Sequence, residues 1–125
     1  IRSTLKSKST VFFSPEKSSF QFGLLSHEKG YKEKPHYHKP FKRIIKDLQQ
    51  MFLVQKGKVL VELYSDDKKL IKKIILKKGD AIVLIHGIHS IHVLEDMQCI
   101  SVKQGPFLGT EFDKVDVKVK KNNLK

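Results

Sequence analysis

The stretch that decides the fold spans residues 51–64 and reads MFLVQKGKVLVELY. Its apolar runs, residues 51–54 and 59–64, are rich in the side chains that strands favour. They flank the short polar segment 55–57, which ends in Gly57. Two such runs around a glycine-containing segment predict a β-hairpin with its turn at residues 55–57.

The same pattern extends along the chain on both sides of this hairpin. Period-two and β-branched runs predict further strands at residues 20–24, 70–76, 81–85, 88–94, 98–103 and, as an edge strand, 115–119. Turn signals separate them at residues 65–68, 78–80, 86–87 and 95–96. Only residues 41–48 could form a turn or two of helix. Turn signals about every 8 to 12 residues are typical of a β-sandwich or barrel, so we expect an all-β fold.

The length of 125 residues favours one domain. We expect a flexible N-terminal arm at residues 1–10, a β-barrel domain at residues 11–120 and a Lys-rich tail at residues 121–125. The longest mostly apolar stretch, residues 81–93, is shorter than the roughly 20 residues of a membrane-spanning helix, so no membrane partner is expected. The single cysteine, Cys99, and the absence of a signal-peptide pattern in residues 1–6 favour a cytoplasmic location.

The charge balance is strongly basic, with 25 Lys and Arg against 13 Asp and Glu and a net charge of +12. A cluster of such charges would indicate a nucleic-acid binder. However, Arg2 and Arg43 are the only arginines, and the lysines are spread along the whole chain. This distribution favours a solvated lysine surface, and nucleic-acid binding is the weaker alternative.

Histidines carry the most chemical information in the sequence. His36 and His38 are two residues apart, so both rings project from the same face of an extended segment and could grip a metal ion. Such a pair needs a third ligand from elsewhere. His89 and His92 are three apart and would point to opposite faces of a strand, so at most one of them can join the pair. The alternative for each is an ordinary surface or core histidine.

The spacing around these histidines resembles the first motif of the cupin family of small β-barrels. Gly30 is followed by five residues and then by His36 and His38, and six residues separate Gln50 from Gly57. Two departures stand out. Eleven residues separate His38 from Gln50, more than the family has there, and Gln50 occupies the position of the family's glutamate.

A second resemblance covers the C-terminal half. The second cupin motif maps onto Gly79 and Gly87, with Ile85 in place of its proline, Ser90 at its histidine position and His89 one residue earlier. The chain is also similar to small cupins found beside bacterial surface-polysaccharide genes, over residues 79–80, 94–96 and 102–107. In those proteins a histidine falls where His89 stands. The resemblance covers roughly residues 20–115.

The resemblance implies a single-domain cupin, a jelly-roll barrel also described as a double-stranded β-helix. The edge strands expected at residues 20–24 and 115–119 predict a homodimer, which is common among the proteins that this chain resembles. The resemblance assigns the site to His36, His38 and His89, with Gln50 at the carboxylate position. Three imidazoles can hold a divalent transition metal such as Zn, Fe, Ni or Mn. A neutral amide is a poorer ligand than a carboxylate, so weaker or more selective metal binding is expected.

Three functions follow from this resemblance. The first is a metal-binding cupin that binds or converts a small polar ligand such as a sugar or a nucleotide sugar. The second is a metal-free enzyme of the sugar isomerase or epimerase type, similar to the nucleotide-sugar 3,4-ketoisomerases, in which His36 and His38 are catalytic and move protons. The third is a sugar-binding module without catalysis. The sequence leaves all three open.

Overall fold

The computed structural model describes residues 1–120, and its regular structure is almost entirely antiparallel β-sheet. This confirms the all-β class. The elements are β1 (Val11–Phe12), β2 (Gly23–Leu24), β3 (Gln50–Tyr64), β4 (Leu70–Lys77), β5 (Ala81–Leu84), β6 (Ile88–Lys103) and the one-turn helix α1 (Thr110–Asp113). The predicted tail at residues 121–125 lies outside the described residues. Within residues 1–120, no helix is long and apolar enough to cross a membrane.

The chain divides into two compact units. The first unit contains Ile1–Ser3 together with the residues from Asp47 onward, and the second unit contains Thr4–Lys46. The boundary therefore falls inside the barrel domain that we expected at residues 11–120. All of the long strands, β3 to β6, belong to the first unit.

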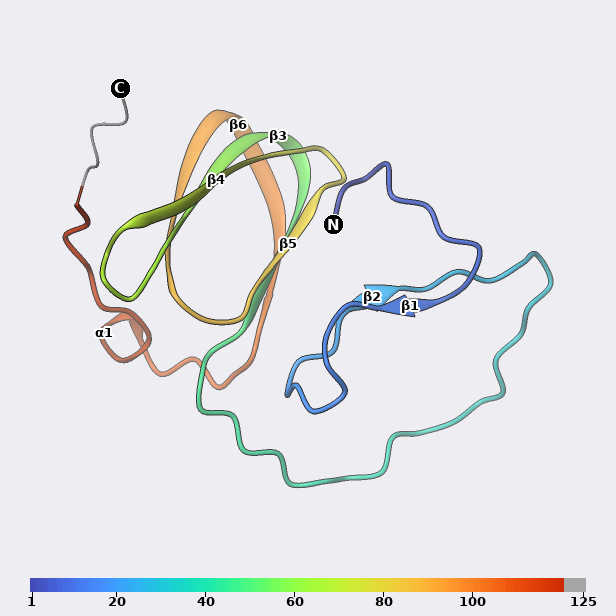
Figure 1. The fold of residues 1–125 in the computed structure, drawn as a ribbon. Coiled ribbons are helices and arrows are strands. Elements are labelled where there is room, and N and C mark those ends of the chain that lie inside the picture. The colour runs from blue at the N-terminus through green and yellow to red at the C-terminus, as the bar shows by residue number, and fades with distance from the viewer. Residues whose placement is uncertain (121–125) are drawn as a thin grey trace. The chain divides into compact units, whose positions relative to one another are not determined.

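Strand β3 is the centre of the first unit. Along one edge it pairs with β5 through residues 50–53 and with β4 through residues 58–64. Along the other edge it pairs with β6 over nearly its whole length, from Gln50 opposite Lys103 to Tyr64 opposite Ile88. Figure 1 shows that β3 and β6 are strongly curved rather than flat. The curvature gives the pair a concave face.

The predicted turns at residues 55–57 and 95–96 are wrong, because β3 and β6 each run through them as one strand. The register between the two strands shifts from Val54 to Val59, which makes these segments a bulge shared by two neighbouring strands. Gly57 has a φ of 80°, and a Cβ there would lie 2.8 Å from the Glu95 carbonyl oxygen. An ion pair between Lys58 and Glu95 spans the bulge. Glycine and polar residues mark bulges as well as turns, and their pattern alone cannot separate the two.

The other expected elements differ in outcome. Strands β4 and β5 lie where the sequence predicts them, and the turns at residues 65–68 and 78–80 are present. The strand expected at residues 20–24 shrinks to the two residues of β2. The edge strand expected at residues 115–119 does not form and pairs with no described strand, because alternation alone supplies no neighbouring edge. Residues 41–48 form no helix, and their apolar side chains are exposed rather than packed.

The core of the first unit is small. Its buried side chains are Val54, Val59, Val61 and Leu76. Partly buried neighbours pack against them: Leu63, Ile74, Ile82 and Met97. Valines at residues 59 and 61 face the same side of β3 because strand side chains alternate. The bulge adds one step to this alternation, so that Val54 faces this side as well.

Residues 1–3 are tied to the turn that precedes β5. The Ala81 N–H donates to the Ile1 carbonyl oxygen at 2.9 Å, and the Ser3 N–H donates to Asp80 Oδ1 at 2.8 Å. Arg2 Nη1 lies 2.8 Å from Asp80 Oδ2, and the Lys77 N–H donates to the same oxygen at 3.1 Å. Asp80 is thus a buried carboxylate that joins Ile1–Ser3 to the sheet.

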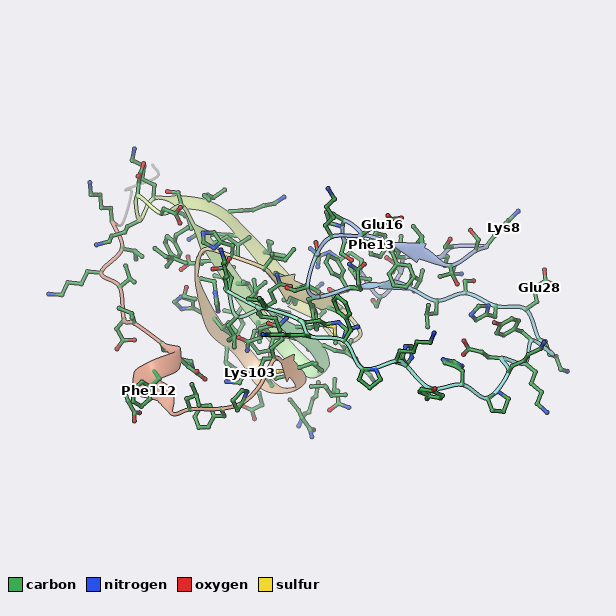
Figure 2. All side chains as sticks on the ribbon, turned by 90° about the horizontal axis from the view of Figure 1, so that it is seen from below. Lys8, Phe13, Glu16, Glu28, Lys103 and Phe112 are labelled. Atoms are coloured by element: carbon green, nitrogen blue, oxygen red, sulfur yellow. The ribbon has the colours of Figure 1, made fainter. Side chains whose placement is uncertain are left out.

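The second unit has little regular structure. Strands β1 and β2 pair over two residues each, next to a contact between the Phe13 and Phe22 rings, whose centroids are 6.2 Å apart. Ser14 Oγ donates to Gln21 Oε1 at 2.9 Å and closes the loop between the two strands. Figure 2 labels Phe13 and Glu16 in this part of the chain.

Candidate functional site

The first unit contains a cavity of about 660 Å³ bordered by β3, β6 and residues 113–117. Four groups of residues line it, together with Leu48. The start of β3 contributes Gln50 and Phe52, and the paired end of β6 contributes Ser101 and Lys103. The opposite end of the curved pair contributes residues 87–91 of β6 and the turn before it, and residues 113–117 complete the wall. Because the strands curve, residues at both ends of β6 border one space.

Two of the four predicted site residues, Gln50 and His89, line this cavity together. Gln50 lies opposite Lys103 in the register of β3 and β6. Its Nε2 donates a hydrogen bond to Ser101 Oγ at 3.4 Å. The side-chain amide oxygen of Gln50 and the hydroxyl proton of Ser101 are left for another partner. His89 comes from the first residues of β6, whereas Ser101 lies near the end of the same strand.

The other two predicted site residues, His36 and His38, belong to the second unit, in a segment without strand structure. Their ring centroids are 5.2 Å apart and the rings are edge to face. His36 Nδ1 lies 3.0 Å from the Lys34 carbonyl oxygen and 3.8 Å from Glu33 Oε1. Within residues 1–120 no group of three or more His, Cys, Asp or Glu side chains is placed to hold a metal ion. The metal site that combines His36 and His38 with Gln50 and His89 stays a prediction.

His89 and His92 lie on opposite faces of β6, as their three-residue spacing predicts. His89 borders the cavity, whereas His92 Nε2 lies 3.1 Å from Glu62 Oε2 on the other face of the sheet. His92 is therefore a neighbour of Glu62 and takes no part in the cavity.

A polar cluster that sequence reasoning missed surrounds Glu62 on this other face. Tyr64 donates its hydroxyl to Glu62 Oε2 at 2.7 Å, and Ser90 donates to the same oxygen at 3.2 Å. Lys73 Nζ lies 3.1 Å from Glu62 Oε1. The hydrogen bond from Tyr64 and the contact with Lys73 outweigh burial and lower the Glu62 pKa from 4.5 to about 2. The same hydrogen bond raises the pKa of the Tyr64 hydroxyl.

The pairing of strands explains how this cluster assembles. Glu62 lies opposite Lys73 on β4 and opposite Ser90 on β6. Opposed residues in a sheet place their side chains on the same face, so three strands contribute to one carboxylate. The only sequence signal was the spacing of Glu62 and Tyr64, which are two apart; their partners depend on register, which the hairpin prediction had wrong.

The cavity wall also contains an ion pair that the sequence did not reveal. Lys103 Nζ lies 3.5 Å from Asp113 Oδ2 and 4.9 Å from the centroid of the Phe107 ring. Lys103 is the last residue of β6, whereas Asp113 ends α1 (Figure 1). Figure 2 labels Lys103 on the sheet and Phe112, the neighbour of Asp113, on the helix. The pair joins the sheet to the segment that follows it.

Comparisons of the chain with protein-family models, with curated proteins and with solved structures find no match.

Proposed function

We propose that this protein is a cupin-type jelly-roll module that binds a sugar or a nucleotide sugar in the cavity of the first unit. The observation that carries the proposal is that Gln50 and His89 line the same cavity. The resemblance assigns these residues to one site, although they lie on different strands. The curvature of β3 and β6, which gives the pair a concave face, supports the jelly-roll part of the proposal.

The chemistry of the cavity wall suits a ligand that is both polar and apolar, as sugars are. Gln50 offers an amide that can donate and accept, Ser101 a hydroxyl and His89 an imidazole. Phe52 and Ile91 add apolar surface between these groups. A volume of about 660 Å³ lies within the range of about 300 to 1,000 Å³ that is usual for small-molecule sites.

A divalent transition metal is part of this proposal, held by His36, His38 and His89 with the Gln50 amide oxygen. Imidazole nitrogens suit Zn, Fe and Ni, whereas Mn prefers oxygen ligands and would bind this donor set less well. A bound metal would act as a Lewis acid on a ligand carbonyl or hydroxyl. The residues' own contributions are to orient the ligand through Gln50 and Ser101 and to limit the charge at the site, since Gln50 is neutral.

Ligand binding is tested by thermal shift against a panel of neutral sugars, UDP-sugars and dTDP-sugars. We expect at least one compound to raise the Tm by several degrees, because a ligand that binds only the folded state stabilises it. The shift should disappear in Gln50→Ala and in His89→Ala. It should persist in Gln98→Ala, which alters an exposed glutamine of β6, the strand that contains His89. No shift with any compound, or shifts that survive both cavity substitutions, would refute the proposal.

Metal binding is tested by elemental analysis of protein purified without chelators. We expect a transition metal in the unaltered protein and a strong loss of it in the His36→Ala/His38→Ala double variant. His86→Ala, which alters an exposed histidine outside the proposed site, should keep the metal. Equal metal contents in the unaltered protein and in the double variant would exclude this site.

A further inference from the structure

We propose that Lys103 binds an anionic group of the cavity's ligand. Without the ligand, Asp113 forms an ion pair with Lys103, and the anionic group replaces Asp113 when it binds. Residues 110–117, here called the flap segment, would then be released from the sheet when the ligand binds. This inference rests on the proposed function, because it concerns the same cavity. It adds the chemical class of the ligand, a phosphate-bearing sugar, and a residue that selects it.

The first observation is that the flap segment is weakly held. Helix α1 has four residues, buries no side chain and has no side-chain hydrogen bond at its N-cap. Phe112 is 74% exposed and Val115 is 87% exposed. Most of the stability of a helix in a protein comes from tertiary packing, and a single turn without it is marginal. Displacing this segment therefore costs little apolar burial.

The second observation is that one ion pair ties the flap segment to the sheet. Its backbone hydrogen bonds, which run to Gly109 and Thr110, stay within the helical turn. In the part of the chain that the structure describes, the contact of Asp113 with Lys103 is the only hydrogen bond or ion pair between the flap segment and β6. Lys103 is fixed by its strand, so release of Asp113 frees the flap segment and leaves the ammonium in place.

The third observation is that every carboxylate of the cavity wall belongs to the flap segment. The sheet contributes groups that can donate hydrogen bonds, namely Gln50, Ser101 and Lys103 on adjoining positions of β3 and β6. Both carboxylates of the wall, Asp113 and Asp116, come from the flap segment, which also contributes the cation Lys114, and the sheet contributes no carboxylate. Without the flap segment, the sheet presents a cation with two neutral donors beside it. That set of donors suits a phosphate oxygen.

Competition between two anions for one ammonium follows from this arrangement. The Asp113 side chain is 13% exposed and that of Lys103 is 34% exposed, so Lys103 is partly removed from water and needs a counter-ion. A phosphate at the same place would also be a negative partner for Lys103, and it would accept hydrogen bonds from Ser101 and Gln50. A neutral sugar offers no such replacement and would leave the pair intact.

The test uses Phe112→Trp as a reporter, since the native chain has no tryptophan and Phe112 is exposed. Inorganic pyrophosphate is the anionic probe and glucose the neutral one. In the reporter protein, pyrophosphate should lower the fluorescence anisotropy of the tryptophan, because the released segment moves more freely, and glucose should not. Asp113→Asn should lower the anisotropy without any ligand. It should also tighten pyrophosphate binding about fivefold, the ratio that corresponds to an ion pair of about 1 kcal/mol.

Lys103→Met should loosen the flap segment as Asp113→Asn does, but should weaken pyrophosphate binding at least tenfold. Lys118→Met, at an exposed lysine outside the cavity wall, is the control for general attraction to a basic protein. Equal pyrophosphate binding in the two lysine variants would overturn the inference, as would unchanged anisotropy in Asp113→Asn. Neither result affects the proposed function, which is judged by sugar binding that depends on Gln50 and His89.

Discussion

Gly57→Ala should lower the free energy of unfolding by about 3 kcal/mol, a large part of the stability of a small domain. Gly57 has a φ of 80°, which costs an alanine about 1 kcal/mol or more. The added Cβ would also lie 2.8 Å from both the Asp96 carbonyl carbon and the Glu95 carbonyl oxygen. These are backbone atoms of the neighbouring strand, so the bulge must open to admit the methyl group, at a cost of about 1 to 3 kcal/mol. Urea unfolding followed by circular dichroism measures the loss.

Gly87→Ala is the matched control for Gly57→Ala. Gly87 also has a positive φ, 99°, but the nearest atom to a Cβ there is the Tyr64 carbonyl oxygen at an ordinary 3.6 Å. The free energy of unfolding of this variant should fall only by the cost of placing an alanine at a positive φ, about 1 kcal/mol. If both alanines cost the same, the close approach of β3 and β6 at the bulge is not what requires glycine at residue 57.

The bulge also shows why the sequence predicted strand content better than strand connection. Apolar β-branched runs marked β4, β5 and both halves of β3 and β6, because burial of one face imposes that composition. Whether Gly57 ends a strand or kinks it depends on the partner across the sheet, which is the matching segment at Glu95 and Asp96. Pairing between residues about forty positions apart leaves no local signal.

Some residues of the candidate site could likewise be predicted from the sequence and others could not. Gln50 and His89 could be found from motif spacing, and both line the cavity. Lys103 and Asp113 could not, because the contact depends on how residues 104–112 return to the sheet, and nothing in their composition fixes that path. Glu62 was missed because its partners Lys73 and Ser90 are defined only by the register of three strands. Motif spacing located Gln50 and His89, whereas contacts that depend on strand register or on the path of a loop left no signal in the sequence.

The second large effect is expected at Asp80, which is 5% exposed and accepts hydrogen bonds from two backbone N–H groups and from Arg2. Burial acts to raise the Asp80 pKa, but the N–H groups of Ser3 and Lys77 and the Arg2 guanidinium outweigh it and lower the pKa from 3.8 to about 2. The ionised carboxylate therefore stabilises the folded state by about 2 kcal/mol at neutral pH. Asp80→Asn should lose about that amount at pH 7, whereas Asp67→Asn, on an exposed turn, should change stability little.

The pH dependence of this difference tests its cause. Because the pKa is lower in the folded state, the stabilisation is complete above pH 3.8 and is lost as the pH falls towards 2. The stability difference between the unaltered protein and Asp80→Asn should therefore shrink by about half at pH 3 and to roughly a fifth at pH 2, where about half of the folded molecules carry a protonated Asp80. Glu62, whose pKa is also about 2, is present in both proteins and cancels from the difference. A difference that stays constant between pH 7 and pH 2 would mean that the shape of the side chain, and not its charge, holds residues 1–3 against the turn before β5.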